Sequence, residues 1–291
     1  MEINLLRELS ASLSGDLYWD NLHKGLYATD ASVYRMVPTA VAYPKDENDL
    51  KALIAFADRH GTSLIPRTAG TSLAGQCVGE GIVVDVSRHF TRILDIDAAR
   101  RRVRVQPGVV RDELNAALEP YGLFFGPNTS TSNRCMIGGM VGNNSSGTTS
   151  IRYGVTRDKV IGLKVLLADG STVETRPLNQ TEFEEKCKGS NFESTIYKTL
   201  HKELSDSSIR EEIIREFPET EIHRRNTGYA VDALLESSVF GGGQNTLNLA
   251  SLLCGSEGTL ALTTEVTLQL DPLPPKEVAM IVPHYKTLEE S

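Results

Sequence analysis

The sequence predicts an α+β protein with two α/β subdomains. Residues 37–86 follow a strand, helix, strand order, which is the pattern of a βαβ unit with parallel strands. Residues 92–106 and 160–175 each read as two strands joined by a short turn, and residues 262–270 alternate apolar and polar side chains. Residues 177–238 are mostly helical in pattern. We therefore expect a small βαβ subdomain and a larger subdomain with helices around a mixed or antiparallel sheet.

The small subdomain is predicted over residues 37–106, after an N-terminal helical segment of residues 1–36. Leucines recur at helical spacing near the start of that segment. The first strand of the subdomain ends at Pro44, and Asp46 is placed to cap a helix that Gly61 terminates. Two further strands and a hairpin complete this part of the chain.

The larger subdomain is predicted over residues 107–275. An amphipathic helix at residues 110–121 opens it, and a hairpin with an Asp-Gly turn at residues 169–170 gives it two strands. The long alternating strand closes it. The prolines that follow interrupt the chain, and residues 278–283 are predicted to begin a new strand.

Composition excludes several classes of function. The net charge of −8 and the isoelectric point near 5.4 argue against a nucleic-acid-binding surface. The four cysteines are far apart and the six histidines do not have the spacing of metal ligands, so we expect no metal site. The cysteine usage fits a protein located in a reducing cytoplasm. The N-terminus does not have the form of a signal peptide, and no apolar run reaches membrane-spanning length.

Three loops of small residues lie beside predicted strands, at residues 66–76, 126–154 and 255–261. Gly, Ser, Thr and Asn give them backbone N–H groups, hydroxyls and amides with little fixed charge. Such a surface suits phosphate or a polar ring, although one loop of this kind could equally fill a corner between sheets. Three in one chain indicate a single extended ligand, and a dinucleotide has the length and the groups to use all of them.

The first loop comes close to a nucleotide-hydrolysing motif but lacks its chemistry. Gly70 and Gly75 have the Walker A spacing, whereas Gln76 and Cys77 stand where that motif needs Lys and Ser or Thr. The Gly-x-Gly-x-x-Gly dinucleotide fingerprint is absent as well. We therefore exclude nucleotide hydrolysis.

The order of the residues in these loops is more specific than their composition. Residues 67–72 read Arg-Thr-Ala-Gly-Thr-Ser, and residues 255–260 read Gly-Ser-Glu-Gly-Thr-Leu. The middle loop contains Pro-x-Thr-Ser, then Ile-Gly-Gly, then Asn-x-x-Gly and Tyr-Gly. Together these motifs resemble the FAD-binding domain (PCMH-type) of the vanillyl-alcohol oxidase superfamily, over about residues 29–272. Within it they are most similar to the FAD-linked 2-hydroxy-acid dehydrogenases, which include glycolate oxidase subunits, D-lactate dehydrogenases and D-2-hydroxyglutarate dehydrogenases.

The resemblance implies the PCMH-type fold and a set of residues that bind FAD. The first loop departs from the family's Arg-Gly-Gly-Gly-Thr-Ser at Thr68 and Ala69 but stays small, so pyrophosphate contact is expected there. The implied cofactor-binding residues are Arg67, Thr68, Ala69, Gly70, Thr71, Ser72, Gly75, Gln76, Pro127, Thr129, Ser130, Thr131, Ile137, Gly138, Gly139, Asn143, Asn144, Gly147, Glu257 and Gly258. Because no His, Tyr or Cys stands next to Gly70, we expect FAD to be bound without a covalent link.

Three residues are candidates for the neighbourhood of the substrate. Residues 224–229 resemble a family segment that runs close to the flavin ring, which places Asn226 and Tyr229 at the substrate pocket. The alternatives are that Asn226 caps a helix and that Tyr229 only packs. Arg152, like Arg225, could orient a carboxylate or be a surface charge.

The function implied by the resemblance is oxidation of a 2-hydroxy acid by hydride transfer to FAD. The electron acceptor would be a quinone, a carrier protein or a downstream iron–sulfur domain. We expect residues 276–291 to begin a truncated substrate or cap domain that carries the catalytic base, so no base is assigned. The alternatives are a reductase like UDP-N-acetylenolpyruvoylglucosamine reductase and a non-catalytic flavin-binding subunit. We expect a cytoplasmic protein, either free or peripheral at the inner membrane.

Overall fold

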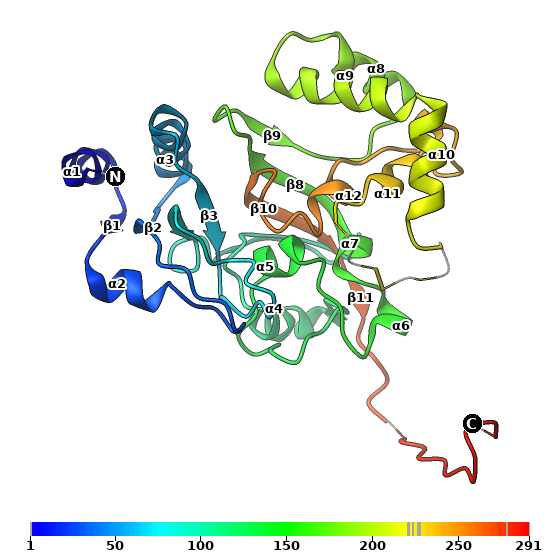
Figure 1. The fold of residues 1–291 in the computed structure, drawn as a ribbon. Coiled ribbons are helices and arrows are strands. Elements are labelled where there is room, and N and C mark those ends of the chain that lie inside the picture. The colour runs from blue at the N-terminus through cyan, green and yellow to red at the C-terminus, as the bar shows by residue number, and fades with distance from the viewer. Residues whose placement is uncertain (1, 220–221, 223, 226–227, 278, 291) are drawn as a thin grey trace.

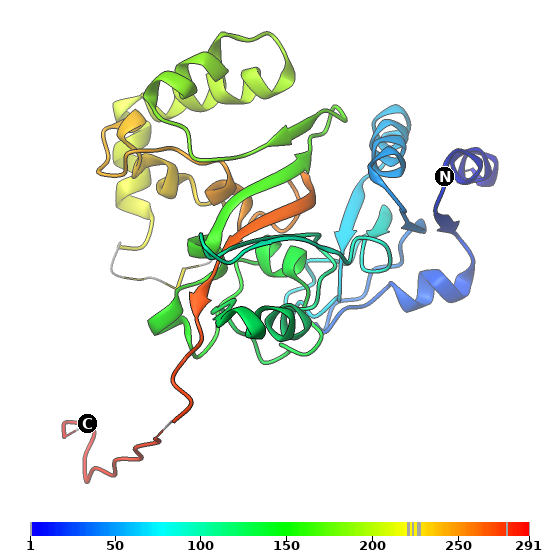
Figure 2. The ribbon, with the colours of Figure 1, turned by 180° about the vertical axis from the view of Figure 1, so that it is seen from behind.

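The computed structural model describes residues 2–290 except 220, 221, 223, 226, 227 and 278, and it confirms the α+β class. Two sheets form the body of the molecule, and helices lie around them (Figure 1). The N-terminal helices flank the first sheet, and α8 to α10 lie at the opposite side of the molecule, which the view from behind also shows (Figure 2).

The first sheet has the strand order β1-β2-β4-β3 and contains the predicted βαβ unit. The strands β2 (Ala40–Tyr43) and β3 (Leu64–Arg67) both pair in parallel with β4 (Ile82–Asp85). The helix α3 (Glu47–His60) forms the crossover between β2 and β3. Parallel pairing therefore brings the loops that follow β3 and β4 to the same edge of the sheet.

The helix α3 begins and ends where the sequence predicts. The side chain of Asp46 accepts hydrogen bonds from the first turn, and Gly61 ends the helix with a φ of 59°. Asp49 is buried and accepts from the backbone N–H groups of Lys45 and Ser14, each at 2.8 Å. Burial alone would raise the pKa of Asp49, but these hydrogen bonds outweigh it and the pKa is lowered.

The N-terminal segment is only partly helical. The helices α1 (Ile3–Ser12) and α2 (Asn21–Leu26) confirm the predicted helical pattern, and Leu6 and Leu9 of α1 are buried. Between them β1 (Asp16–Tyr18) pairs antiparallel with β2, so residues 1–36 share a sheet with the small subdomain from which the prediction separated them. A strand of three residues is too short to reveal its period in the sequence.

The second sheet is antiparallel and has the order β5-β6-β10-β8-β9. Its strands are β5 (Ile93–Asp97), β6 (Arg102–Val105), β10 (Leu262–Gln269), β8 (Val160–Leu166) and β9 (Thr172–Glu174). The hairpin of β5 and β6 was assigned to the small subdomain, but it pairs with β10 of the second sheet. The division between the sheets therefore falls before residue 93 and not at residue 106. The sheet that this hairpin joins depends on its pairing with β10, which lies far away in the sequence.

The remaining elements surround this sheet. A two-stranded pair joins β7 (Leu123–Phe124) to β11 (Asp271–Pro272). The helices are α4 (Arg111–Leu118), α5 (Ile137–Gly142), α6 (Ser150–Tyr153), α7 (Thr156–Lys159), α8 (Gln180–Lys188), α9 (Phe192–Leu204), α10 (Ser207–Glu216), α11 (Val231–Leu235) and α12 (Ala250–Leu253), with 3₁₀ turns η1 (Glu119–Tyr121) and η2 (Ser238–Phe240). None of the helices in the described residues is long and apolar enough to cross a membrane.

A continuous apolar core joins the two sheets. The core of the first sheet includes Leu50, Leu53 and Val84, and Leu166 and Leu262 of the second sheet pack into the same cluster. Burial of this kind contributes about 1.5–3 kcal/mol for each fully buried large side chain. The shared cluster packs the first sheet and α3 against the second sheet.

The predicted strand at residues 278–283 is wrong for the part of it that the structure describes. Residues 279–283 have no regular secondary structure, and Met280 and Ile281 are exposed. The described residues after β11 run away from the body of the molecule (Figures 1 and 2). A strand needs a neighbour to accept its backbone hydrogen bonds, and here no described strand lies alongside.

Candidate functional site

One cavity of about 540 Å³ brings the three predicted loops together. The loop after β3, the stretch around α5 and the loop before β10 all contribute to its lining. These segments are separated by many residues in the sequence and meet only in the folded chain. The volume falls within the range of small-molecule and cofactor sites.

The side-chain amide of Gln76 joins the three loops directly. Its Nε2 donates to Oδ1 of Asn143 at 2.9 Å and to Oε1 of Glu257 at 2.8 Å. Its Oε1 accepts from the hydroxyl of Ser72 at 2.6 Å, within its own loop. One side chain therefore fixes the relative position of all three segments at the cavity.

Two glycines permit close backbone approach between the loops. A Cβ at Gly139 would lie 2.7 Å from Oγ1 of Thr68, which is closer than real Cβ contacts. A Cβ at Gly258 would lie 2.8 Å from Cγ of Pro66, and Gly258 also has a φ of 74°. Glycine at these positions lets the second and third loops touch the first.

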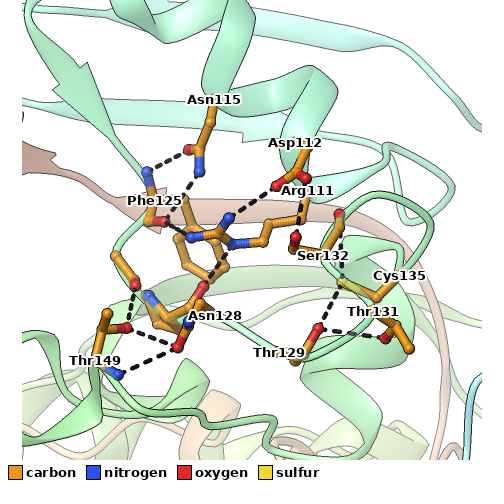
Figure 3. Close-up of polar contacts among 12 residues, drawn as sticks. Arg111, Asp112, Asn115, Phe125, Asn128, Thr129, Thr131, Ser132, Cys135 and Thr149 are labelled. Carbon is orange, nitrogen blue, oxygen red and sulfur yellow. Dashed lines mark hydrogen bonds and ion pairs between the residues drawn. The ribbon is translucent and has the colours of Figure 1, made fainter.

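The stretch before α5 is held in shape by α4. Arg111 donates from Nε to the carbonyl oxygen of Pro127 at 2.8 Å and pairs through Nη1 with Asp112 at 2.8 Å. The side chain of Asn115 accepts from the backbone N–H of Phe125 at 2.7 Å. Figure 3 shows Arg111 and Asn115 reaching the chain from Phe125 onward, while Asp112 holds the other side of the Arg111 guanidinium. The threonines that follow are thereby presented to the cavity.

Most of the predicted cofactor-binding residues line the cavity. Those in its lining are Arg67, Thr68, Gly70, Thr71, Ser72, Gln76, Thr129, Ser130, Thr131, Gly138, Gly139, Asn143, Glu257 and Gly258. Those outside its lining are Ala69, Gly75, Pro127, Ile137, Asn144 and Gly147. The second group lies in the same three loops, so the motif spacing located the loops without distinguishing which residues face inward.

Several of the residues outside the lining support the loops from behind. Asn144 is buried with a φ of 46°, and its Oδ1 accepts from the backbone N–H of Arg157 at 2.9 Å. Ile137 is buried in the apolar core. Gly147 packs against the backbone of Asn128, where a side chain would collide. Their role in this structure is to shape the middle loop.

Arg157 connects the middle loop to the third loop and was not predicted. Its Nε donates to the carbonyl oxygen of Ser251 at 3.0 Å, and its Nη2 donates to that of Cys254 at 2.6 Å. Burial lowers the pKa of Arg157 from its ordinary value. Cys254 directly precedes Gly255, so the bond from Arg157 to Cys254 fixes the start of the third loop.

Other lining residues come from outside the three loops and carry no sequence signal. Ala31 contributes from the N-terminal segment, and Leu50, Val86 and Leu262 contribute apolar surface. In the sequence each of these residues looks like an ordinary core or turn residue. Their place at the cavity results from how the two sheets meet.

Two cysteines line the cavity but are poorly disposed to react. Burial raises the pKa of the Cys77 thiol to about 11. Burial also raises the pKa of Cys135, which the hydroxyl of Thr129 contacts at 3.2 Å. Since the thiolate is the nucleophilic form, neither residue is activated for covalent attachment.

Neither of the two substrate-proximal candidates that the structure describes, Arg152 and Tyr229, lines the cavity. Arg152 is exposed, lies outside the cavity lining and has its guanidinium 5.6 Å from the ring centre of Tyr153. Asn226 falls outside the described residues. The hydroxyl of Tyr229 lies 2.7 Å from Oγ1 of Thr259, next to Gly258 of the cavity. Arg225, the other arginine considered for a carboxylate, is paired with Asp232.

The lining suits a long, anionic, ring-bearing cofactor such as FAD. Hydroxyls and amides of the three loops supply neutral donors, and Arg67 and Arg134 supply positive charge. Among the described residues no group of three or more His, Cys, Asp and Glu side chains is placed to hold a metal ion.

Comparison with known proteins agrees with this geometry. A family model described as "FAD binding domain" matches residues 38–176. A D-2-hydroxyglutarate dehydrogenase of Pantoea ananatis is 40% identical over 250 residues, which cover 85% of this chain and 24% of that protein. Glycolate oxidase subunit GlcD of Bacillus subtilis is 36% identical over 174 residues, covering 58% of this chain and 37% of that protein.

The solved structures show the same fold. An alkyldihydroxyacetonephosphate synthase superposes with a TM-score of 0.64 at 18% identity, over 94% of this chain and 41% of that one. The chain spans about a quarter of the length of the D-2-hydroxyglutarate dehydrogenases that it matches. The resemblance inferred from the loops is confirmed for the FAD-binding part: residues 38–176 match an FAD-binding domain, the chain is similar to D-2-hydroxyglutarate dehydrogenases, and it shares the fold of the alkyldihydroxyacetonephosphate synthase.

Proposed function

We propose that this chain is the FAD-binding part of an oxidoreductase that acts on a 2-hydroxy acid of the D-2-hydroxyglutarate, D-lactate or glycolate type. Bound FAD would supply the acceptor for the hydride that leaves the carbon bearing the hydroxyl group. The observation that carries the proposal is the set of hydrogen bonds from Gln76 to Asn143 and Glu257. These bonds join three loops, each with a sequence motif that resembles the family, around one cavity. The similarity to D-2-hydroxyglutarate dehydrogenases and glycolate oxidase subunits supports the substrate class.

The chain's own residues have the task of binding and orienting the cofactor. We assign the pyrophosphate to the loop of residues 67–76, because it combines Arg67 with neutral hydroxyl donors in the cavity lining. Residues 129–131 and the α5 region would contact the rest of the cofactor, and Glu257 and Gly258 would lie toward the adenosine. We assign no catalytic base to any described residue.

We further propose that FAD is bound without a covalent link. The raised pKa values of the cavity thiols support this assignment, since protonated thiols are weak nucleophiles. Denaturing the purified chain should release all the flavin into the supernatant, as measured by its absorbance after precipitation. Yellow colour retained on the precipitated protein would contradict the assignment.

We propose Tyr229 as a residue near the substrate only because residues 224–229 resemble the family's flavin-adjacent sequence. Its hydroxyl bond to Thr259 lies next to Gly258, at the end of the site assigned above to the adenosine, and so does not support that role. Arg152 is exposed and remains a weaker candidate for a carboxylate. The electron acceptor would be a quinone, a carrier protein or an iron–sulfur domain, and we propose a cytoplasmic protein with or without peripheral contact to the inner membrane.

The proposal is tested in two steps. The first is the absorbance spectrum of the purified chain, in which flavin bands near those of free FAD are expected. The second is anaerobic bleaching of the flavin in the complete gene product by D-2-hydroxyglutarate, D-lactate or glycolate. Bleaching by NADPH instead would favour the UDP-N-acetylenolpyruvoylglucosamine reductase alternative, and activity that resides wholly in a co-purifying subunit would favour a non-catalytic role. The comparisons favour neither alternative.

A further inference from the structure

The guanidinium of Arg67 is held in place before any ligand arrives. Its Nη1 donates to the carbonyl oxygen of Thr29 at 2.9 Å, and its Cζ lies 4.9 Å from the ring centre of Tyr27. A Cβ at Gly70 would lie only 2.5 Å from its Nη2, so the guanidinium covers the Gly70 turn. Gly70 has a φ of 65° and lines the cavity.

Tyr27 is in turn anchored to the end of the first sheet. Its hydroxyl donates to Oδ2 of Asp85 at 2.5 Å and accepts from the hydroxyl of Tyr43 at 2.9 Å. Asp85 is only 4% exposed, and the parallel pairing of β3 with β4 places it directly opposite Arg67. Burial, followed by the bond to Asp85, raises the pKa of Tyr27 above its ordinary value, so the phenol stays a proton donor.

These contacts form a chain from a buried carboxylate to the cofactor loop. Asp85 fixes Tyr27, the ring of Tyr27 supports one face of Arg67, and Arg67 lies on the Gly70 turn. A guanidinium has five N–H groups in a rigid fork, and the bond to Thr29 uses one of them. Holding the fork still before binding removes part of the entropic cost of ordering it around an anion.

We propose that Tyr27 and Asp85 are positioning residues that hold the Arg67 guanidinium over the Gly70 turn for contact with the FAD pyrophosphate. The inference rests on the proposed placement of the pyrophosphate at residues 67–76. Neither residue belongs to the motifs that identify the family in this sequence. Their role follows from the contacts to Arg67 and from the register of β3 and β4.

The test compares FAD with riboflavin, which has the flavin ring but lacks the pyrophosphate. Tyr27→Phe keeps the ring but removes the bond to Asp85, and Asp85→Asn removes the charge that anchors Tyr27. Each variant of the full chain is expected to bind FAD about 3- to 10-fold more weakly, the value of one net hydrogen bond, with riboflavin affinity unchanged. Tyr18→Phe is the matched control, because the ring centre of Tyr18 lies 5.8 Å from that of Tyr43 in the same aromatic cluster. This variant should bind both ligands like wild type.

A double-mutant cycle tests whether Tyr27 acts through Arg67. In an Arg67→Ala background, Tyr27→Phe should cause no further loss of FAD affinity. Additive losses in the cycle, or FAD affinity unchanged in both single variants, would overturn the inference. Equal loss of FAD and riboflavin affinity would overturn it as well, because that result indicates a general disturbance of the fold. A wild-type chain that binds no FAD would overturn the proposed function and this inference together, whereas the other results leave the proposed function standing.

Discussion

The amide of Gln76 offers the sharpest test of how the site is built. Gln76→Leu keeps a similar side-chain volume and removes the bonds to Ser72, Asn143 and Glu257. A neutral hydrogen bond contributes about 0.5–1.5 kcal/mol net and one to a charged group about 1.5–3 kcal/mol. These side chains face a solvent-accessible cavity, so we take the low end of each range and expect about 2.5 kcal/mol for the two neutral bonds and the one charged bond together. At about 1.4 kcal/mol per tenfold, FAD affinity should fall roughly 60-fold.

The assay is quenching of flavin fluorescence on titration of FAD with the chain, alongside thermal unfolding of the apoprotein. Gln180→Leu is the control, because Gln180 makes a comparable bond to Glu184 at 2.8 Å on the surface of α8, away from the cavity. The control should leave the dissociation constant unchanged. An affinity within twofold of wild type for Gln76→Leu, with a normal unfolding curve, would refute the view that this amide organises the three loops.

Three further substitutions probe the supports of the site. Gly258→Ala combines a strained positive φ with a collision against Pro66 and should lower both stability and FAD affinity, by about 1–3 kcal/mol in urea unfolding, whereas Gly243→Ala, with open space around it, should not. Arg157→Met removes two bonds to carbonyl oxygens at the start of the third loop, and the free energy of unfolding should fall by about 2–4 kcal/mol. Asp49 has a lowered pKa, so its stabilisation is fully present above the ordinary Asp pKa of 3.8 and is lost as the pH falls through the lower folded value. The stability difference between wild type and Asp49→Asn in urea unfolding should therefore shrink as the pH is lowered below about 4; a constant difference would contradict the assignment.

Some features of this protein were readable from local sequence because local chemistry decides them. The ends of α3 follow from the capping side chain of Asp46 and the left-handed Gly61. The hairpin of β8 and β9 turns at Gly170, which has a φ of 80°. The three loops stood out because close backbone approach requires small residues, and the structure brings them to one cavity.

The misassigned elements have a common physical cause. The hairpin of β5 and β6 looked like part of the first subdomain because its sequence neighbours are there, but its free edge pairs with β10, more than 150 residues away. The strand β1 was too short to show a period. Residues 279–283 have a strand-like composition but no described partner strand, and composition alone does not supply one.

The sequence by itself determined the family, the cofactor class and the three loops, because glycine turns and small donors leave a local pattern in the order of residues. Only the tertiary structure decided which of those residues face the cavity and which support it from behind. It also revealed Gln76 as the link among the loops, Arg157 as their clamp and the Tyr27–Asp85 pair beneath Arg67. These contacts join segments up to 181 positions apart, and a side chain's distant partner depends on packing that no local period or spacing records.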